Sequence, residues 1–331
     1  MKHFPIPLPP PGKFNGQVCV VTGGTGGLGL AAAAHLVNLG AEEVIITSRN
    51  KERARQALVK LEQETHGLSK NVVRVLELDM NRYSSVVAFT EEVKKVRARK
   101  GGVDFVLLNA GLIGYEYKLA AEGWEQNIQV NVLSTVLIAF LLLPWMKSER
   151  VNRSGPSHLS IVGSEKHLDP NIKLWNTIIT QGSKDGMLAY YNDPKKWPGP
   201  DGMYGITKLM VTYSSKTGVI VNTMCPGQVK TDLARHYAEA SRAIAMILPV
   251  FMGIKGKTPE NGARTLIVTG LTEEKENGKF IKFYGSEENY QKKADIIFGS
   301  ETGRKVQNSL WSEIIRVLAT KVPAVNEILA S

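Results

Sequence analysis

Short apolar segments alternate with amphipathic helical segments along most of this sequence, and this alternation constrains the fold more than any other feature. Strand–helix–strand units place consecutive strands in parallel, with right-handed crossovers. We therefore predict an α/β fold with a doubly wound parallel sheet of about seven strands flanked by helices. The predicted strands are 17–22, 43–47, 72–78, 103–108, 158–162, 219–224 and 280–284, and the predicted helices are 27–39, 50–63, 82–99, 122–146, 203–216, 262–269 and 309–319.

The 331 residues are predicted to form a single domain, 16–331, after a Pro-rich arm at 1–15. A rule of about 150 residues per domain would give two domains, but single α/β domains are often longer. Residues 165–202 are polar and show little periodicity, so we interpret them as an insertion, a lid or a disordered loop. We expect the apolar segment 232–258 to be a substrate lid and 300–331 to be a C-terminal helical extension.

The excess of 41 Lys and Arg over 31 Asp and Glu gives a net charge of +10, which is typical of proteins with anionic partners. The basic residues are scattered and no basic–aromatic stripe is present, which argues against nucleic acid. Cys19 and Cys225 cannot form a disulfide framework, and no metal site is predicted. The apolar run 136–146 is too short to span a membrane, and the prolines near the start do not resemble a signal peptide. We expect a cytoplasmic protein.

A glycine-rich turn, TGGTGGLG at 22–29, joins the first predicted strand to the first predicted helix. Glycines allow a tight turn and close approach of the backbone to a ligand. The helix N-terminus that follows offers free N–H groups to phosphates. The position of the turn predicts a nucleotide phosphate site on a Rossmann-type sheet.

The glycine turn is the first of six motifs that occur in the order found in one enzyme family. Its spacing is T-G-x-x-x-G-x-G, and it is followed by Asp79, N-A-G at 109–111, Asn131, Ser164 with Y-x-x-x-K at 204–208, and P-G-x-V-x-T at 226–231. The chain thus resembles the short-chain dehydrogenase/reductase family. The cofactor-binding residues that this resemblance implies are Gly23, Thr25, Gly27, Leu28, Gly29, Ser48, Arg49, Asn50, Asp79, Met80, Asn109, Ala110, Gly111, Tyr204, Lys208, Pro226, Gly227, Val229 and Thr231.

The end of the second predicted strand indicates which cofactor is used. An NAD-specific enzyme places an acidic residue there, on the ribose 2′-OH. This chain has Arg49 between Ser48 and Asn50, and a guanidinium pairs well with a 2′-phosphate. We therefore predict NADP(H), with Arg49 as the main contact and its two neighbours as helpers.

Asn131, Ser164, Tyr204 and Lys208 match the catalytic residues of the family. Tyr204 and Lys208 are four residues apart, so they share one helix face. A free tyrosine has a pKa near 10, and we expect the Lys208 ammonium to lower it. The resemblance implies that Ser164 binds a substrate carbonyl oxygen, that Tyr204 protonates it, and that Lys208 holds the cofactor ribose. Asn131 would position a water that links Lys208 to solvent.

Two departures from the common family pattern qualify this assignment. Ser164 and Tyr204 are unusually far apart, as in the branch of retinol dehydrogenases and fungal ketoreductases. The aromatic and apolar side chains of the intervening segment would either cover a bulky substrate or anchor the segment to the body of the protein. The stretch from Lys208 to Val221 is short, and the family uses the helix there in a homodimer, so the oligomeric state stays open. The aromatic and apolar residues of the intervening segment that could have either role are Trp175, Met187, Tyr190, Tyr191 and Trp197.

The resulting functional prediction is an NADPH-dependent carbonyl reductase for a medium-sized hydrophobic ketone or aldehyde. A specialised-metabolite intermediate or a retinoid- or steroid-like compound would fit. The alternatives are a non-redox cyclase or dehydratase on the same fold, and a noncatalytic NADPH-binding regulator.

Overall fold

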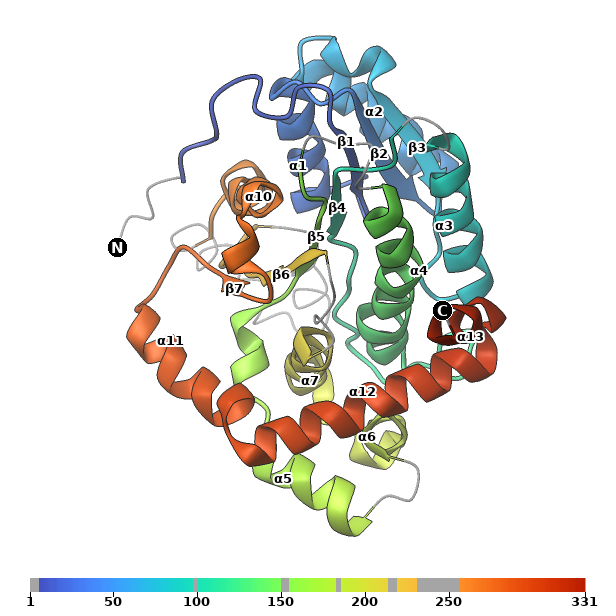
Figure 1. The fold of residues 1–331 in the computed structure, drawn as a ribbon, viewed down its shortest axis with the longest axis vertical. Helices are drawn as coiled ribbons and strands as arrows, with labels where there is room; N and C mark the ends of the chain where they lie inside the picture. The colour runs from blue at the N-terminus through green and yellow to red at the C-terminus, as the bar shows by residue number, and fades with distance from the viewer. Residues whose placement is uncertain are drawn as a thin grey trace.

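A parallel sheet of seven strands, in the order β3-β2-β1-β4-β5-β6-β7, forms the centre of the computed structural model (Figure 1). The structure describes residues 6–97, 101–149, 155–182, 186–213, 219–230 and 256–330. All neighbouring strands run parallel, which confirms the predicted fold class. The strands are β1 (Val18–Val21), β2 (Glu43–Ser48), β3 (Val73–Glu77), β4 (Phe105–Leu108), β5 (His158–Val162), β6 (Ile220–Met224) and β7 (Phe280–Ile281).

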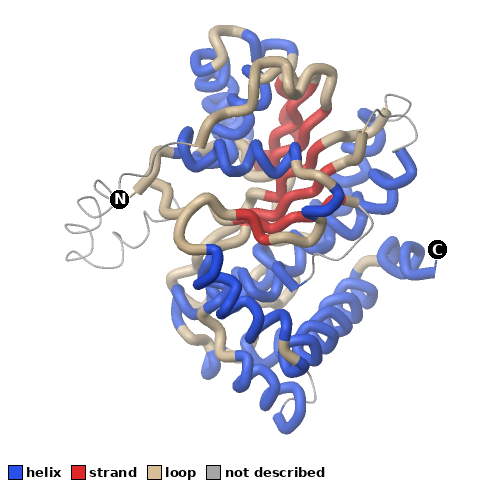
Figure 2. Tube along the Cα trace, turned by 60° about the vertical axis from the view of Figure 1, so that its left-hand side comes forward, coloured by secondary structure: helices blue, strands red, loops and turns tan. Residues whose placement is uncertain are grey.

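Helices cover both faces of the sheet, as Figure 2 shows. Side chains alternate between the faces of a strand. Accordingly, Val18 and Val20 of β1 join a core with α3, α4 and α7, whereas Cys19 and Val21 join a second core with α1, α2 and α10. The helices are α1 (Gly27–Asn38), α2 (Lys51–Glu64), α3 (Tyr83–Arg97), α4 (Thr135–Ser148), α5 (Ile172–Thr177), α6 (Gly186–Tyr191), α7 (Gly199–Tyr213), α10 (Pro259–Val268), α11 (Glu287–Ala294), α12 (Glu301–Lys321) and α13 (Pro323–Ala330).

The strand order reverses direction at β1, which lies between β2 and β4. Ligands of open α/β sheets bind outside the carboxyl ends of the strands at such a switch point. The segments that follow β1 to β6 at this edge carry most of the predicted site residues, and η2 and α7 supply Asn131, Tyr204 and Lys208. The topology alone therefore brings together motifs that are up to two hundred residues apart.

The prediction of an irregular insertion at 165–202 is wrong for the part that the structure describes. This segment forms a 3₁₀ turn (Glu165–Leu168), α5, a π-helical turn (Ile178–Gly182), α6 and another 3₁₀ turn (Pro194–Lys196). Helices of about six residues are too short to show an amphipathic pattern, and they depend on tertiary packing. Here that packing comes from α12, which runs past α5, α6 and α7 (Figure 1).

The side chains of the insertion anchor it to the body of the protein. Trp175 is only 1% exposed, and Met187 and Tyr191 are also buried in the core. The Glu313 carboxylate of α12 accepts hydrogen bonds from the backbone N–H groups of Met187 and Leu188, at 2.8 and 2.9 Å. It thus caps α6 from another helix, because the first N–H groups of a helix lack partners within it. We conclude that these buried side chains serve packing rather than substrate contact.

Several element boundaries differ from the prediction. The helix expected at 203–216 begins earlier, at Gly199, and the last helix expected at 309–319 is longer, spanning 301–321. β7 has two residues rather than five, and α11 and α13 were not predicted. Most of the expected lid at 232–258, and Thr231, lie outside the described residues.

One helical stretch, Ile128–Ser148, is long and apolar enough to cross a membrane. However, 83% of its most apolar window is buried inside the protein, which is the position of a core helix. It begins with a π-helical turn, η2 (Ile128–Ser134), a feature often found at functional sites. Asn131, one of the predicted catalytic residues, lies in this turn.

Candidate active site

The glycine turn after β1 forms a cradle with free backbone donors. Gly23 has a φ of +66°, and its N–H donates to the Thr47 hydroxyl at 3.0 Å. The N-cap of α1 is Gly26, which provides no side-chain cap, and the first turn carries no acidic residue. The N-terminus of α1 is therefore open to an anionic group.

The N-A-G motif after β4 ties this cradle to the centre of the sheet. The Asn109 amide Nδ2 donates to the Thr22 carbonyl at 2.9 Å, and the Ala110 N–H donates to the Thr22 hydroxyl at 3.0 Å. A Cβ on Gly29 would lie 2.4 Å from the Gly23 carbonyl oxygen and 2.6 Å from Asn109 Nδ2. Gly29 thus allows α1 to pack closely on its own turn.

A cavity of ≈ 450 Å³ extends along the carboxyl edge of the sheet and brings most of the predicted residues together. Sequence reasoning missed several of its lining residues, because they belong to no motif. The predicted residues that line it are Gly23, Thr25, Gly27, Leu28, Ser48, Arg49, Asp79, Met80, Asn109, Ala110, Gly111, Ser164, Tyr204, Lys208, Pro226, Gly227 and Val229. The others are Gly26, Thr47, Arg53, Leu78, Asn81, Leu112, Val130, Val162, Gly163 and Cys225.

Gly29, Asn50 and Asn131 do not line this cavity but support it. The Asn50 side chain caps α2 by accepting from the Arg53 N–H at 2.9 Å. Asn131 binds both backbone groups of Leu112 at 2.9 Å, and its Nδ2 also donates to the Thr207 hydroxyl. A Cβ on Gly111 would lie 3.2 Å from Asn131 Oδ1 and 3.8 Å from Lys208 Nζ. Asn131 and Lys208 therefore flank Gly111.

Ser164, Tyr204 and Lys208 meet where β5 ends and α7 begins to cross it. Ser164 caps the 3₁₀ turn Glu165–Leu168, because its hydroxyl accepts from the Lys166 N–H at 3.3 Å. It lines the same cavity as Tyr204 and Lys208. Lys208 Nζ lies 5.3 Å from the centre of the Tyr204 ring. The same ammonium donates to the Val162 carbonyl at 2.6 Å, which fixes its position beside the ring.

The expectation that Lys208 lowers the pKa of Tyr204 is wrong for this geometry. Burial raises the pKa of the Tyr204 hydroxyl and outweighs the opposing effect of the Ser164 hydrogen bond. Burial also lowers the pKa of Lys208 to about 8, because a charged ammonium is poorly solvated there. Tyr204 is consequently held in its protonated form, which is the form that can donate a proton.

Comparisons with known proteins agree with this geometry. Residues 17–155 match the family described as "short chain dehydrogenase". The chain is 31% identical to the short-chain dehydrogenase/reductase phmF of Phaeosphaeria nodorum, over 97% of this chain and 91% of that relative. The chain belongs to the short-chain dehydrogenase/reductase family. It is also 30% identical to the short-chain dehydrogenase/reductase ffsI of Aspergillus flavipes, over 98% of this chain and 92% of the relative.

Solved structures of other proteins share the fold. The crystal structure of the KRED1-Pglu enzyme matches with a TM-score of 0.55 at 21% identity, covering 80% of this chain and 100% of that one. A putative NAD(P)-dependent gluconate 5-dehydrogenase from Beutenbergia cavernae, with bound NADP at low occupancy, matches with a TM-score of 0.57 at 18% identity, covering 82% and 96%. At this level of identity, the likeness establishes the fold alone.

Short-chain dehydrogenases/reductases are oxidoreductases that bind NAD(P), and the residues of this chain fit such a cofactor. The uncapped N-terminus of α1 and the close approach of Gly29 leave room and donors for a diphosphate. Asp79 is held beside the cavity, with its carboxylate accepting from both N–H groups of Asn81 that face it, at 3.0 and 2.8 Å. The cradle is thus ordered by the protein itself.

Arg53 is the residue of this family member that sequence reasoning missed at the end of β2. It lies in the first turn of α2 and lines the cavity together with Arg49, which precedes the N-cap of that helix. Of the two residues expected to help Arg49, Ser48 also lines the cavity and its Oγ donates to the Asn50 carbonyl at 2.8 Å, whereas Asn50 caps α2. The i, i+4 spacing of the two arginines across the N-cap would have been a usable signal.

Replacing the buried Lys208 by methionine is expected to raise the melting temperature. Because the pKa of Lys208 is lowered to about 8, the buried ammonium reduces the free energy of unfolding at all pH values below about 8. Above that pH the folded state loses the proton while the unfolded chain keeps it up to its ordinary pKa, so wild-type stability rises. The difference in melting temperature between Lys208→Met and the wild type should therefore become smaller between pH 7 and pH 9.5, as measured by thermal unfolding. A difference that grows with pH would contradict this sign.

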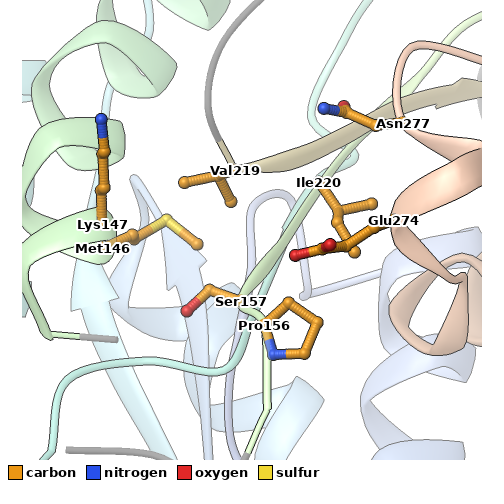
Figure 3. A pocket seen from close by; sticks show the side chains of 8 residues that line it. All are labelled: Met146, Lys147, Pro156, Ser157, Val219, Ile220, Glu274 and Asn277. Carbon is orange, nitrogen blue, oxygen red and sulfur yellow. The ribbon is translucent and has the colours of Figure 1, made fainter. Parts of the chain in front are cut away.

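A second cavity, of ≈ 260 Å³, lies at the amino ends of β5 and β6, at the edge of the sheet opposite the glycine turn (Figure 3). It therefore does not belong to the candidate active site. Within the described part of the chain, no group of three or more His, Cys, Asp or Glu side chains is arranged to hold a metal ion. The lining residues of the second cavity are Met146, Lys147, Pro156, Ser157, Val219, Ile220, Glu274 and Asn277.

Proposed function

We propose that this protein is an NADPH-dependent carbonyl reductase that acts on a medium-sized, mostly apolar ketone or aldehyde. The observation that carries the proposal is that Ser164, Tyr204 and Lys208 share the wall of the cavity that holds the glycine cradle, with Lys208 Nζ beside the Tyr204 ring. Binding a nucleotide requires neither hydroxyl. A specialised-metabolite intermediate, or a retinoid- or steroid-like compound, would fit this substrate class.

Ser164, Tyr204 and Lys208 have different roles in the proposed reduction of the carbonyl group. When bound, NADPH supplies the hydride that reduces the carbonyl carbon. The Ser164 hydroxyl donates a hydrogen bond to the substrate oxygen and orients it. Tyr204, which burial keeps protonated, transfers its proton to that oxygen, so that an alcohol forms. Lys208 holds the cofactor ribose. Lys208 and Asn131 both lie close to Gly111, and together they form the route by which Tyr204 regains a proton from solvent.

The two arginines at the start of α2 support a preference for NADPH. Arg49 and Arg53 both line the cavity, and Glu52, the acidic residue of this turn, is held by Arg55 through hydrogen bonds of 3.1 and 2.9 Å. A guanidinium pair can bind the 2′-phosphate in a charge-assisted fork. The two buried thiols, Cys19 and Cys225, are free, which fits a reducing compartment, and we place the reaction in the cytoplasm.

Replacing Arg49 by aspartate is expected to shift the ratio of kcat/KM for NADPH over NADH by roughly 100-fold toward NADH, because a carboxylate repels a 2′-phosphate and binds a 2′-OH. Steady-state kinetics with both cofactors measure this ratio. Lys60→Asp, an exposed position on α2 outside the cavity, is the matched control and should leave the ratio unchanged. An unchanged ratio in Arg49→Asp would remove Arg49 from this role.

The proposed function is tested by following NADPH oxidation at 340 nm with a panel of hydrophobic ketones and aldehydes, together with NADPH binding by calorimetry. Reduction of at least one class of carbonyl, with an alcohol as product, is the expected result. Binding of NADPH without turnover of any carbonyl would instead favour a noncatalytic regulator. Conversion of a panel compound without NADPH consumption would favour a cyclase or dehydratase.

A further inference from the structure

His167 is a buried titratable residue next to the catalytic serine that the proposed reaction does not use. Its side chain is fully buried, and its ring Nδ1 lies 2.7 Å from the carbonyl oxygen of Ser164. The backbone N–H of His167 donates to the same oxygen at 3.0 Å. Two donors from one residue therefore converge on the backbone of Ser164, which lines the cavity together with Tyr204.

These contacts determine the tautomer of His167. A carbonyl oxygen only accepts, so Nδ1 must carry the proton. Nε2 is then an acceptor, and the Tyr290 hydroxyl lies 3.4 Å from it as the donor. Burial lowers the pKa of His167 to about 4, which keeps the ring neutral and in this single tautomer at physiological pH.

The walls around the His167 ring come from the C-terminal part of the chain. The ring packs edge-on against Phe280 of β7, with centroids 4.4 Å apart, and against Tyr290 of α11, at 5.9 Å. The ring of Phe298, in the π-helical turn Asp295–Gly299 that follows α11, lies 5.6 Å from it. Phe280 and Tyr290 are themselves stacked, 5.2 Å apart and nearly parallel. The C-terminal aromatic box (Phe280, Tyr290 and Phe298) thus fixes the plane of the imidazole.

We propose that His167 is a positioning residue for Ser164, held in place by the C-terminal aromatic box. The Nδ1–H bond to the Ser164 carbonyl, added to the backbone bond, fixes the 3₁₀ turn whose N-cap is Ser164, and with it the place of the Ser164 hydroxyl in the cavity wall. A backbone bond alone would leave this turn free to rotate, because a single 3₁₀ turn is intrinsically weak. The inference rests on the proposed function, since it assigns His167 to the positioning of the serine that binds the substrate oxygen.

The test compares His167→Leu, which removes the donor, with His167→Asn, whose side-chain N–H can replace Nδ1–H. His167→Leu is expected to lower kcat about 10- to 100-fold with little change in the NADPH dissociation constant, because misplacing a reacting group acts on the chemical step. His167→Asn should recover kcat to within about threefold of wild type. Leu310→Ala, which removes a buried side chain of α12, controls for loss of stability and should leave kcat unchanged.

The proposal is overturned if His167→Leu keeps wild-type kcat, or if His167→Asn and Leu310→Ala lose as much as His167→Leu. Hydrogen exchange at residues 164–168 gives a second readout that needs no turnover. Exchange there should accelerate at least tenfold in His167→Leu but not in His167→Asn, and equal rates in both variants would overturn the proposal. If the wild type reduces no carbonyl, the proposed function fails, and the exchange experiment still decides whether His167 orders the turn.

Discussion

Tyr204→Phe is expected to lower kcat/KM for carbonyl reduction by about 10²- to 10⁴-fold, the usual contribution of a general acid. The substitution removes one hydroxyl and keeps the ring that packs beside Lys208 Nζ. The raised pKa of Tyr204 makes its protonated form persist, so the wild-type reduction rate should not fall between about pH 6 and 9 through loss of this acid. Stopped-flow measurement of NADPH oxidation, over a range of pH, separates the chemical step from product release.

Tyr190→Phe is the matched control for this variant. Tyr190 lies in α6, packs against the Tyr191 ring at 5.1 Å and carries Lys196 over its face. A phenylalanine preserves both contacts, and activity should stay at the wild-type level. NADPH affinity in Tyr204→Phe should change by less than about tenfold, because one hydrogen bond at most is lost. Wild-type turnover in Tyr204→Phe would exclude the proposed proton transfer.

Gly29→Ala should reduce NADPH affinity at least 100-fold. The added methyl group would lie 2.4 Å from the Gly23 carbonyl oxygen, which is backbone and cannot move aside as a side chain can. Relief of this contact would shift the turn that Asn109 holds and close the cradle, at a typical cost of about 1–3 kcal/mol. Calorimetry of NADPH binding measures the first effect, and thermal unfolding measures the second.

Gly155→Ala provides the comparison, since a Cβ at Gly155 meets nothing within 4 Å. It should bind NADPH and unfold as the wild type does. If Gly29→Ala also binds NADPH normally, α1 would have to tolerate displacement from its own turn. That result would contradict the interpretation of the glycine spacing as a packing requirement.

The parts of the fold that sequence analysis predicted correctly are those set by local chemistry. The strands β1, β2, β4 and β5 are largely buried and rich in Val, Ile, Leu and Phe, and the glycine turn needs conformations that other residues avoid. The residues of the catalytic and glycine motifs lie together because parallel strands end at one edge. Their proximity therefore followed from the order of the motifs, whereas the roles of these residues stay predictions until the variants are tested.

The rest depends on contacts between distant segments, which no local pattern reveals. The short helices of the insertion form because α12 covers them, and Glu313 caps α6 from more than a hundred residues away. The upward shift in the pKa of Tyr204 reflects burial by the assembled core, so the spacing of Tyr204 and Lys208 gave the wrong direction. Arg53 lines the cavity because of the way the start of α2 is oriented against the sheet, which the sequence around Arg53 does not reveal.

Because the Glu313 carboxylate of α12 caps α6, the insertion can complete its folding only after α12 has been synthesised. During synthesis, a ribosome releases Ser164, Tyr204 and Lys208 long before α12 leaves the exit tunnel. Until then the backbone donors at the start of α6 have no carboxylate partner, and Trp175 has no helix to cover it. The predicted site residues are therefore synthesised well before the helix that supports the insertion. A chain truncated shortly before α12 would contain all the sequence motifs, but its insertion would lack the packing partner of α5 and α6.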